Sequence, residues 1–388
     1  MYNPDKYSAA LNKVVEFFEV VEALFISKVA KQIQKIGELN QTSINRLLIM
    51  RDMGADVAEV KRKLQDATGY STRAMARIYR SALNDRYTDQ HFDDFVKTVP
   101  PAEAREDNAR LNQLARSMLR QTAGELVNLS NTTVIDNAYR AAIDPAIAAV
   151  ASGVEDYQSA TRDAVRTMAA NGLRVTYESG YTRRLDSAVR QNITNGVKQL
   201  AQQSSLMIGE MMGDDAIELS AHLRSAPDHE PIQGRVFLNA EFAKMQSQQA
   251  FSDIDGHRYE AIKRPIGEWN CGHIGSSFNT QHSIRTYTDE QLKQFSEDNE
   301  KGCEINGKHY STYEASQLMR KVETKIRQQK DIANAARDAG DETLRAECQR
   351  KINRLKQYYG SIAEASGLRE QQQRLRVDGF KSVRVPKE

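Results

Sequence analysis

Cysteine and aromatic residues are scarce in this sequence, and each scarcity excludes a class of fold. Only three cysteines occur in 388 residues, so they cannot all pair with one another and no disulfide framework is expected. We therefore expect a chain made in a reducing cytoplasm. Aromatic residues make up 7% of the chain and charged residues 27%, which favours helices with solvated faces over an aromatic-rich β fold. The cysteines are Cys271, Cys303 and Cys348.

Long uncharged runs are also missing. The apolar stretch from Val14 to Val29 is interrupted by charged side chains, and no run approaches the roughly 20 residues that span a bilayer. The polar segment Met1–Asp5 does not resemble the start of a secretory leader. The sequence therefore predicts no membrane partner. The interrupting residues are Glu16, Glu19, Glu22 and Lys28.

A large charge imbalance and the usual enzyme signatures are absent as well. Lys and Arg exceed Asp and Glu by only two, 54 against 52, so any basic surface must be local. The sequence contains no P-loop, dinucleotide-binding fingerprint or serine nucleophile elbow. The length exceeds that of one compact domain, so two or three domains are expected.

The patterns that are present predict a mainly α fold with a small α+β domain. We expect an N-terminal helical bundle over residues 1–99 and a central region of long helices over 102–212. A small α+β domain with short strands is expected over 216–310, followed by a basic C-terminal helical hairpin and tail over 311–388.

The N-terminal region carries one long apolar stripe, followed by signals for short helices. Residues 8–36 repeat apolar side chains at three- and four-residue steps, as an amphipathic helix does. Gly54 and Gly69 are predicted to end two short helices, and Ser71 to start another. The stripe either packs on the chain's own helices or binds a partner through aromatic anchors. Those anchors would be Phe17, Phe18 and Phe25.

The central region begins at a proline pair and continues in long helical patterns. Pro100-Pro101 stops any preceding helix, and helices are predicted over about 102–127, 131–151 and 157–212, with Gly172 as a candidate break. Four cations lie off the apolar stripe of the last helix and could contact DNA phosphates, or could form an ordinary solvated face. They are Arg183, Arg184, Arg190 and Lys198.

From about residue 216 the pattern changes to short strands and turns. Alternation over Ile217–His222 and the run Arg235–Leu238 predict two strands, and Asn306-Gly307 predicts a type I′ hairpin. Thr288 is a helix cap signal. Beyond Tyr310 two basic helices follow, separated by Gly340. Four cations on the first of these are further DNA-contact candidates: Lys321, Lys325, Arg327 and Lys330.

The most unusual chemistry lies in two loop segments, at residues 221–237 and 271–273. His222, His229, Cys271 and His273 are residue types that suit Zn²⁺, although their spacing matches no common zinc motif. Two alternatives remain. The four side chains could form a structural polar core, or a histidine could act as a general base. In that case Arg224 or Arg235 would bind an anion.

These segments carry a family resemblance. The pattern His-x-x-x-Ala-Pro-x-His-x-x-x-Gln-Gly-x-Val at 222–236, then Trp-Asn-Cys-x-His at 269–273, resembles the phage minor capsid protein 2 family. That family is similar to the F-type head morphogenesis proteins of tailed phages. Residues 63–71 and 307–317 also resemble family segments. One departure is Gly272, where the family usually has an arginine between cysteine and histidine, so any role of that charge is in doubt here.

The resemblance implies a virion structural protein, not an enzyme. It would be a minor head protein inside the capsid near the portal, made in the host cytoplasm. Its partners would be the portal protein, the major capsid protein or a scaffold, and packaged double-stranded DNA. Two other functions stay open on the residues alone. One is a metal-dependent hydrolase or nuclease using the His/Cys cluster, and the other is a plain DNA-binding protein.

Overall fold

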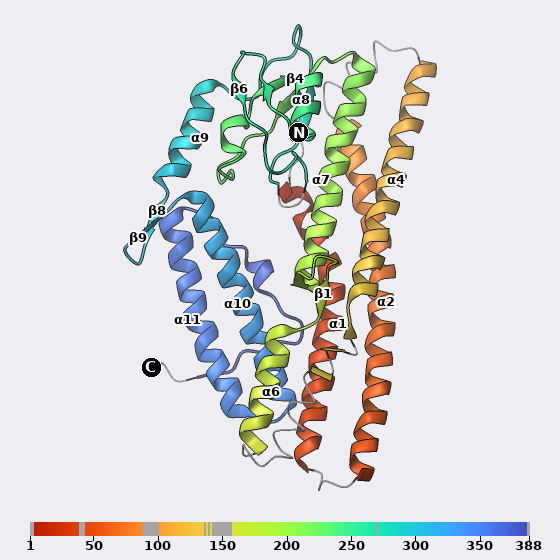
Figure 1. Ribbon diagram of the computed structural model, residues 1–388, viewed down its shortest axis with the longest axis vertical. Helices are drawn as coiled ribbons and strands as arrows, with labels where there is room; N and C mark the ends of the chain where they lie inside the picture. Colours follow the sequence, from red (N-terminus) through yellow and green to blue (C-terminus); the bar gives the residue numbers. More distant parts are fainter. Residues whose placement is uncertain are drawn as a thin grey trace. The chain divides into compact units, whose positions relative to one another are not determined.

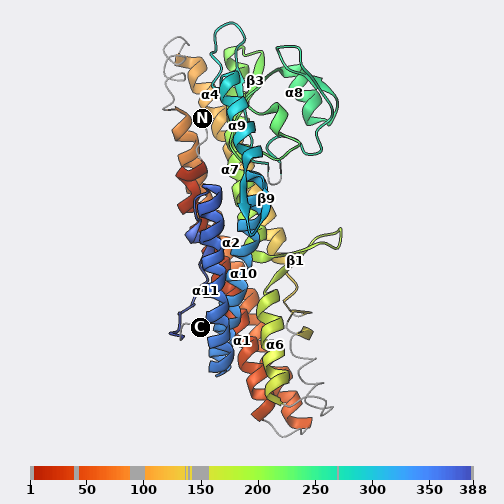
Figure 2. The same cartoon turned by 90° about the vertical axis from the view of Figure 1, so that its left-hand side faces the viewer.

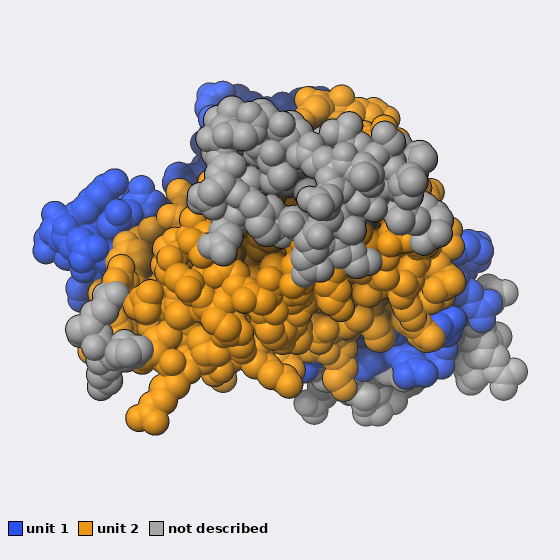
Figure 3. All heavy atoms as spheres, turned by 90° about the horizontal axis from the view of Figure 1, so that it is seen from below, with its two compact units in different colours: residues 1–11, 72–124, 191–317 blue, residues 12–71, 125–190, 318–388 orange. Residues whose placement is uncertain are grey.

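The computed structural model describes residues 4–38, 43–87, 101–135, 137–138, 140–141, 157–268 and 271–385. The chain divides into two compact units, each built from three separate stretches of sequence (Figure 3). Unit 1 comprises residues 1–11, 72–124 and 191–317, and unit 2 comprises residues 12–71, 125–190 and 318–388. No helix in the described part of the chain is long and apolar enough to cross a membrane.

Long helices dominate the structure, as Figure 1 shows, and the predicted mainly α class is confirmed. Short antiparallel strands occur chiefly between residues 216 and 310, where the small α+β part was predicted. The helices are α1 (Pro4–Glu38), α2 (Ser43–Tyr87), α4 (Pro101–Thr132), α6 (Tyr157–Asn171), α7 (Leu185–Met212), α8 (Asn239–Gln246), α9 (Asp289–Lys301), α10 (Thr312–Asp338) and α11 (Glu342–Ser366).

The apolar stripe of α1 belongs to the core of the protein itself. Val14, Phe18 and Ile33 are fully buried, and the ring of Phe17 lies 5.6 Å from that of Tyr70 on α2. The alternative in which this stripe is free for a partner is therefore wrong. Burying each large side chain of the stripe stabilises the folded protein by roughly 1.5–3 kcal/mol. The folded chain is therefore more stable with the stripe packed in its own core than with the stripe exposed to water.

Helix α2 is continuous where short helices were predicted. Gly54 and Gly69 lie inside it and do not end it. A glycine in a helix costs about 1 kcal/mol relative to alanine. Val60 and Leu64 between the two glycines are buried, and burying two such side chains outweighs the local cost.

The predicted helix over 157–212 is interrupted after α6. Gly172 adopts φ 58°, and a Cβ at this position would collide with the carboxylate of Glu22, so only glycine fits. The chain then forms a hairpin of β1 (Arg174–Thr176) and β2 (Thr182–Arg184) before α7 begins. The helix predicted over 131–151 lies largely outside the described residues, as does Pro100 of the predicted proline break.

The small α+β part contains a three-stranded antiparallel sheet. Its order is β4 (Val236–Leu238), β3 (Ala216–Leu219), β7 (Gly275–Phe278). Strands β3 and β4 correspond to the two predicted strands. Side chains of the sheet and of α8 form one apolar cluster that includes Leu219, Phe237 and Met245. A short pair of β5 (Phe251–Ser252) and β6 (Arg258–Tyr259) packs onto it.

Two local predictions in this part are confirmed. Asn306 and Gly307 have φ of 53° and 73° and join β8 (Cys303–Ile305) to β9 (Lys308–Tyr310), as a type I′ turn requires. Thr288 caps α9. Its side chain accepts a hydrogen bond from the Gln291 backbone N–H, and the Gln291 side chain accepts one from the Thr288 backbone N–H.

Unit 2 contains a buried cluster of charges. The Arg184 guanidinium lies 3.0 Å from the Glu22 carboxylate and 2.8 Å from that of Asp331, and Arg327 pairs with Asp186 at 3.2 Å. Burial alone would raise the pKa of Asp186, but Arg327 and Arg184 outweigh it and lower that pKa to about 2. The carboxylates and guanidiniums therefore depend on one another for charge compensation.

Replacing Arg184 should destabilise the protein strongly. In Arg184→Met the acids around it lose their counter-charge inside the protein, and we expect a loss of about 3–5 kcal/mol in the free energy of unfolding in urea. The neighbouring Arg183 is half-buried and pairs loosely with the Tyr181 ring, so Arg183→Met should cost less than about 1 kcal/mol. Equal losses in the two variants would contradict the role assigned to the cluster.

Candidate metal centre

The antiparallel pairing of β3 with β7 brings the two unusual loop segments together. Leu219 at the end of β3 pairs with Gly275 at the start of β7, and the Ser220 amide donates to the Ile274 carbonyl at 2.9 Å. The loop that leaves β3 and the loop that enters β7 therefore meet at one end of the sheet. The first loop carries His222 and His229, and the second carries Cys271 and His273.

Three of these side chains place ligand atoms close together. Cys271 Sγ lies 3.5 Å from His229 Nδ1 and 3.8 Å from His273 Nδ1. One ligand atom from each of the three residues lies within 4.8 Å of the others. His222 is outside this set but lies beside it. Its ring stacks on that of His273, with the ring centroids 4.3 Å apart.

In each histidine, one ring nitrogen faces an oxygen atom of the protein. His229 Nε2 donates to the Arg264 carbonyl at 2.9 Å, and His222 Nδ1 to the Leu223 carbonyl at 3.0 Å. His273 Nε2 lies 3.4 Å from the side-chain oxygen of Gln233. These contacts fix the tautomers, so the other nitrogen of each ring keeps its lone pair.

The cluster is buried, and its burial sets its electrostatics. His229, Cys271 and His273 are at most 2% exposed. Burial lowers the pKa of His222, and it lowers the pKa of His273 well below the usual range, so both rings are neutral at pH 7. Burial alone would raise the pKa of Cys271, but the hydrogen bond and charge of His229, together with backbone hydrogen bonds at Gly267 and His273, outweigh it and lower that pKa.

The geometry does not support Cys271 as a nucleophile or Arg235 as an anion binder. Cys271 and His229 are in contact, but the sulfur packs within the apolar cluster of the sheet, where a substrate cannot reach it. Arg235, one predicted anion binder, lies within 4.0 Å of carboxylate oxygens of Asp253, Asp255 and Asp289, so its charge is already compensated. Arg224, the other predicted anion binder, is exposed, and its backbone φ is 79°.

Comparison with known proteins identifies the family. The family model for phage minor capsid protein 2 matches residues 2–360, which is nearly the whole chain. The chain belongs to the phage minor capsid protein 2 family. No curated protein and no solved structure matches it. Membership assigns the chain to the bacteriophage virion and to contacts with other head components, and the resemblance seen in the sequence is confirmed.

The family motif and its one departure can be placed in the structure. Trp269 and Asn270 of the motif lie outside the described residues. Gly272, where this minor capsid protein lacks the family's arginine, is exposed, and a Cβ there would collide with His222 Nε2. The absence of a side chain at this position therefore allows His222 to stack on His273 as it does here.

The DNA-contact candidates fall into three groups. Arg184, Arg327 and Lys330 are buried, which removes them from any surface that DNA reaches; the sequence predicted an exposed face because it cannot show which polar face is covered. The second group is engaged by partners within the protein: Lys198 donates to the Cys271 carbonyl at 2.8 Å, and the Arg190 guanidinium lies 3.7 Å from the Glu19 carboxylate. The remaining candidates are at least partly exposed: Arg183, Lys321 and Lys325.

Two other polar clusters of this minor capsid protein were not predicted. In the first, Asp253, Asp255 and His257 lie close together, but Asp253 is already satisfied by the Tyr259 hydroxyl at 2.9 Å and by His257 Nδ1 at 3.0 Å. The residues hydrogen-bond to one another in the turn between β5 and β6. The Asp-x-Asp-x-His spacing at 253–257 is the sequence signal that could have predicted this cluster.

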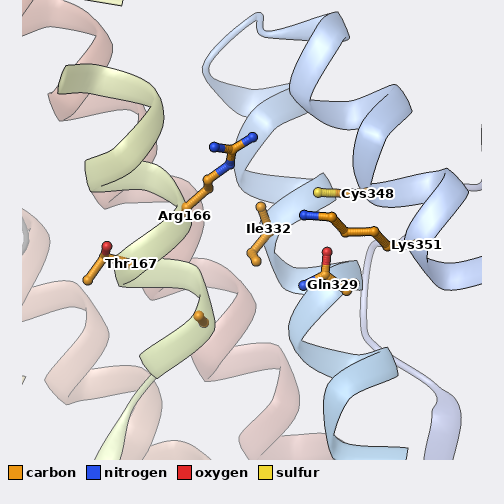
Figure 4. A pocket seen from close by; sticks show the side chains of 7 residues that line it. Arg166, Thr167, Gln329, Ile332, Cys348 and Lys351 are labelled. Carbon is orange, nitrogen blue, oxygen red and sulfur yellow. The ribbon is translucent and has the colours of Figure 1, made fainter. Parts of the chain in front are cut away.

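The second lines a cavity of about 260 Å³ between α6, α10 and α11 (Figure 4). Arg166 is paired with Glu347 at 2.6 Å, and burial raises the pKa of the Cys348 thiol to about 11, so this sulfur is not a nucleophile at neutral pH. The lining residues are Arg166, Thr167, Ala170, Gln329, Ile332, Cys348 and Lys351.

A methyl group at position 272 should disturb the histidine stack. In Gly272→Ala the new Cβ meets His222, whose ring cannot retreat without leaving His273 and the Leu223 carbonyl. We expect a decrease of about 1–3 kcal/mol in the free energy of unfolding in urea. Gly54→Ala, where a Cβ meets nothing within 4 Å, is the control and should not destabilise.

The double variant His222→Ala/Gly272→Ala tests the same contact directly. It should lose less stability than the sum of the two single variants, because removing the ring makes room for the methyl group. Additive losses would show that the two positions do not touch in solution.

Proposed function

We propose that this minor capsid protein is present in few copies per virion, inside the capsid near the portal, where it contacts packaged DNA and has no catalytic role. Family membership supports the virion and a head protein. The observation that carries the finer proposal is a separation of charge on α10 and α11. Over residues 318–330 of α10 and 348–363 of α11, the acids that would neutralise the exposed lysines are buried or missing.

Helix α10 presents cations without exposed acids over residues 318–330. The one acid in this segment, Glu323, is buried and accepts a hydrogen bond from the Tyr359 hydroxyl at 2.8 Å. Lys321 and Lys325 are exposed on the same helix. An exposed surface with lysines and no carboxylates attracts phosphate, whatever the base sequence.

Helix α11 extends this pattern. Residues 348–363 contain no Asp or Glu, while Lys351 and Lys356 are exposed. The overall charge of +2 conceals this local imbalance, because many of the acids lie elsewhere in the chain. Packaged DNA fills a phage head, so a phosphate-binding face supports an interior location.

The hairpin β1–β2 supports a protein contact. Tyr181 near its tip is 58% exposed, its ring stacks on Tyr177 at 6.0 Å, and the Arg183 guanidinium lies 5.7 Å from the Tyr181 ring. Figure 2 shows the hairpin extending away from α6 and from the start of α7. Tyrosine and arginine are favoured anchors in interfaces, so we assign this hairpin to the portal protein, with the major capsid protein or a scaffold as the other candidates.

The DNA contact is tested by the salt dependence of binding. The variant Lys321→Gln/Lys325→Gln should weaken binding equally for unrelated duplexes. It should also flatten the slope of log affinity against log salt by up to about 0.9 for each phosphate that is no longer bound. Lys61→Gln/Lys63→Gln on α2 removes the same charge from a segment that also carries acids, and should leave the slope unchanged. An identical slope in all three proteins would contradict the DNA contact.

The location is tested in particles of the phage that encodes the chain. Quantitative mass spectrometry should find few copies per portal, and Tyr181→Ala should lower that number because it removes an interface anchor. Tyr310→Ala is the matched control, since Tyr310 also lies on a hairpin under a cation, Lys308, but is only partly exposed. Copy numbers near those of the major capsid protein, or absence from particles, would overturn the proposal.

A further inference from the structure

We propose that His229, Cys271 and His273 bind one Zn²⁺ ion that clamps together the loops at the end of the β4–β3–β7 sheet. The ion would be structural. This inference rests on side-chain geometry inside unit 1 and not on the virion role, so either could fail without the other.

The spacing of the ligand atoms fits a tetrahedral metal. Zinc bonds of about 2.3 Å to sulfur and 2.0–2.1 Å to nitrogen place sulfur and nitrogen ligands roughly 3.5 Å apart. The distances from Cys271 Sγ to the Nδ1 atoms of His229 and His273 are 3.5 Å and 3.8 Å. A thiol donating its hydrogen to one of these nitrogens would also fit such a length, but a thiol has a single hydrogen and here two ring nitrogens face one sulfur.

The surroundings of the cluster hold its histidines as metal ligands are held. His229 directs Nδ1 at the sulfur while Nε2 donates to the Arg264 carbonyl, and Arg264 is itself fixed by Asp228 at 2.9 Å. A histidine ligand that donates its second nitrogen to a carbonyl is the usual arrangement around zinc. Gln233 faces Nε2 of His273 in the same way.

We assign His222 as the fourth ligand, although its Nε2 lies outside the converging set of three in the structure. Its Nε2 is buried with no hydrogen-bond partner, although Nδ1 is held by the Leu223 carbonyl. A buried nitrogen with a free lone pair is costly unless something binds it. It stands beside His273, so a ligand set of one cysteine and three histidines lies within one small region.

The fold around the cluster suits such a clamp. The strands of the sheet are three or four residues long, and between β3 and β4 the only regular structure is the three-residue 3₁₀ helix Glu230–Ile232. A metal commonly fixes loops that connect short strands. Thiolate and imidazole ligands favour Zn²⁺ over Mg²⁺ or Ca²⁺.

Metal content of the full chain tests the proposal. The protein purified from zinc-containing medium should carry one Zn²⁺ per chain by elemental mass spectrometry. Cys271→Ser should lose most of it, while Cys303→Ser and Cys348→Ser should keep it, because both of those cysteines are buried outside the cluster. His282→Ala, at an exposed histidine, is the matched control for His229→Ala.

Cobalt gives a second measurement, which tests the site itself on the wild-type chain alone. Co²⁺ added to the chelator-treated wild-type chain should produce the intense visible bands of a tetrahedral site and a sulfur-to-cobalt charge-transfer band. His222→Ala should retain the charge-transfer band but release the metal more readily to a chelator. An unchanged release would overturn the assignment of His222. Wild-type protein that is folded, zinc-free and spectroscopically silent with Co²⁺ would overturn the site.

Discussion

The buried guanidinium of Arg184 is the constraint on which the arrangement of unit 2 depends. It lies among Glu22 of α1, Asp186 at the start of α7 and Asp331 of α10, so one side chain ties together three segments far apart in sequence. None of these charges is stable alone in the interior, because desolvation of each costs several kcal/mol. The β1–β2 hairpin before α7 places Arg184 among these carboxylates. A straight helix through residues 171–185 would not place it there.

This constraint also shows where prediction from sequence stops. Local signals such as the Asn306-Gly307 turn, the Thr288 cap and the α1 stripe were predicted because they depend on neighbouring residues. The continuity of α2 through Gly54 was not, since tertiary packing decides it. Nor was the burial of Arg327 and Lys330, because a basic helix face looks the same in sequence whether solvent or another helix covers it.

The candidate site divides in the same way. The sequence identified His222, His229, Cys271 and His273 by residue type, and their convergence follows from the pairing of β3 with β7, strands more than fifty residues apart. Spacing along the chain could not reveal that only three of them place ligand atoms within 4.8 Å of one another, or that His222 stacks on the ring of His273. Those details depend on loop geometry and on the missing side chain at position 272.

Burial decides what kind of site this is. A catalytic metal needs an open coordination position and a path for substrate, whereas a structural one is closed by protein ligands. Here His229, Cys271 and His273 are almost wholly buried, and the sulfur belongs to the same apolar cluster as Phe237 and Met245. The closed surroundings of these three side chains therefore fit the structural class of metal site.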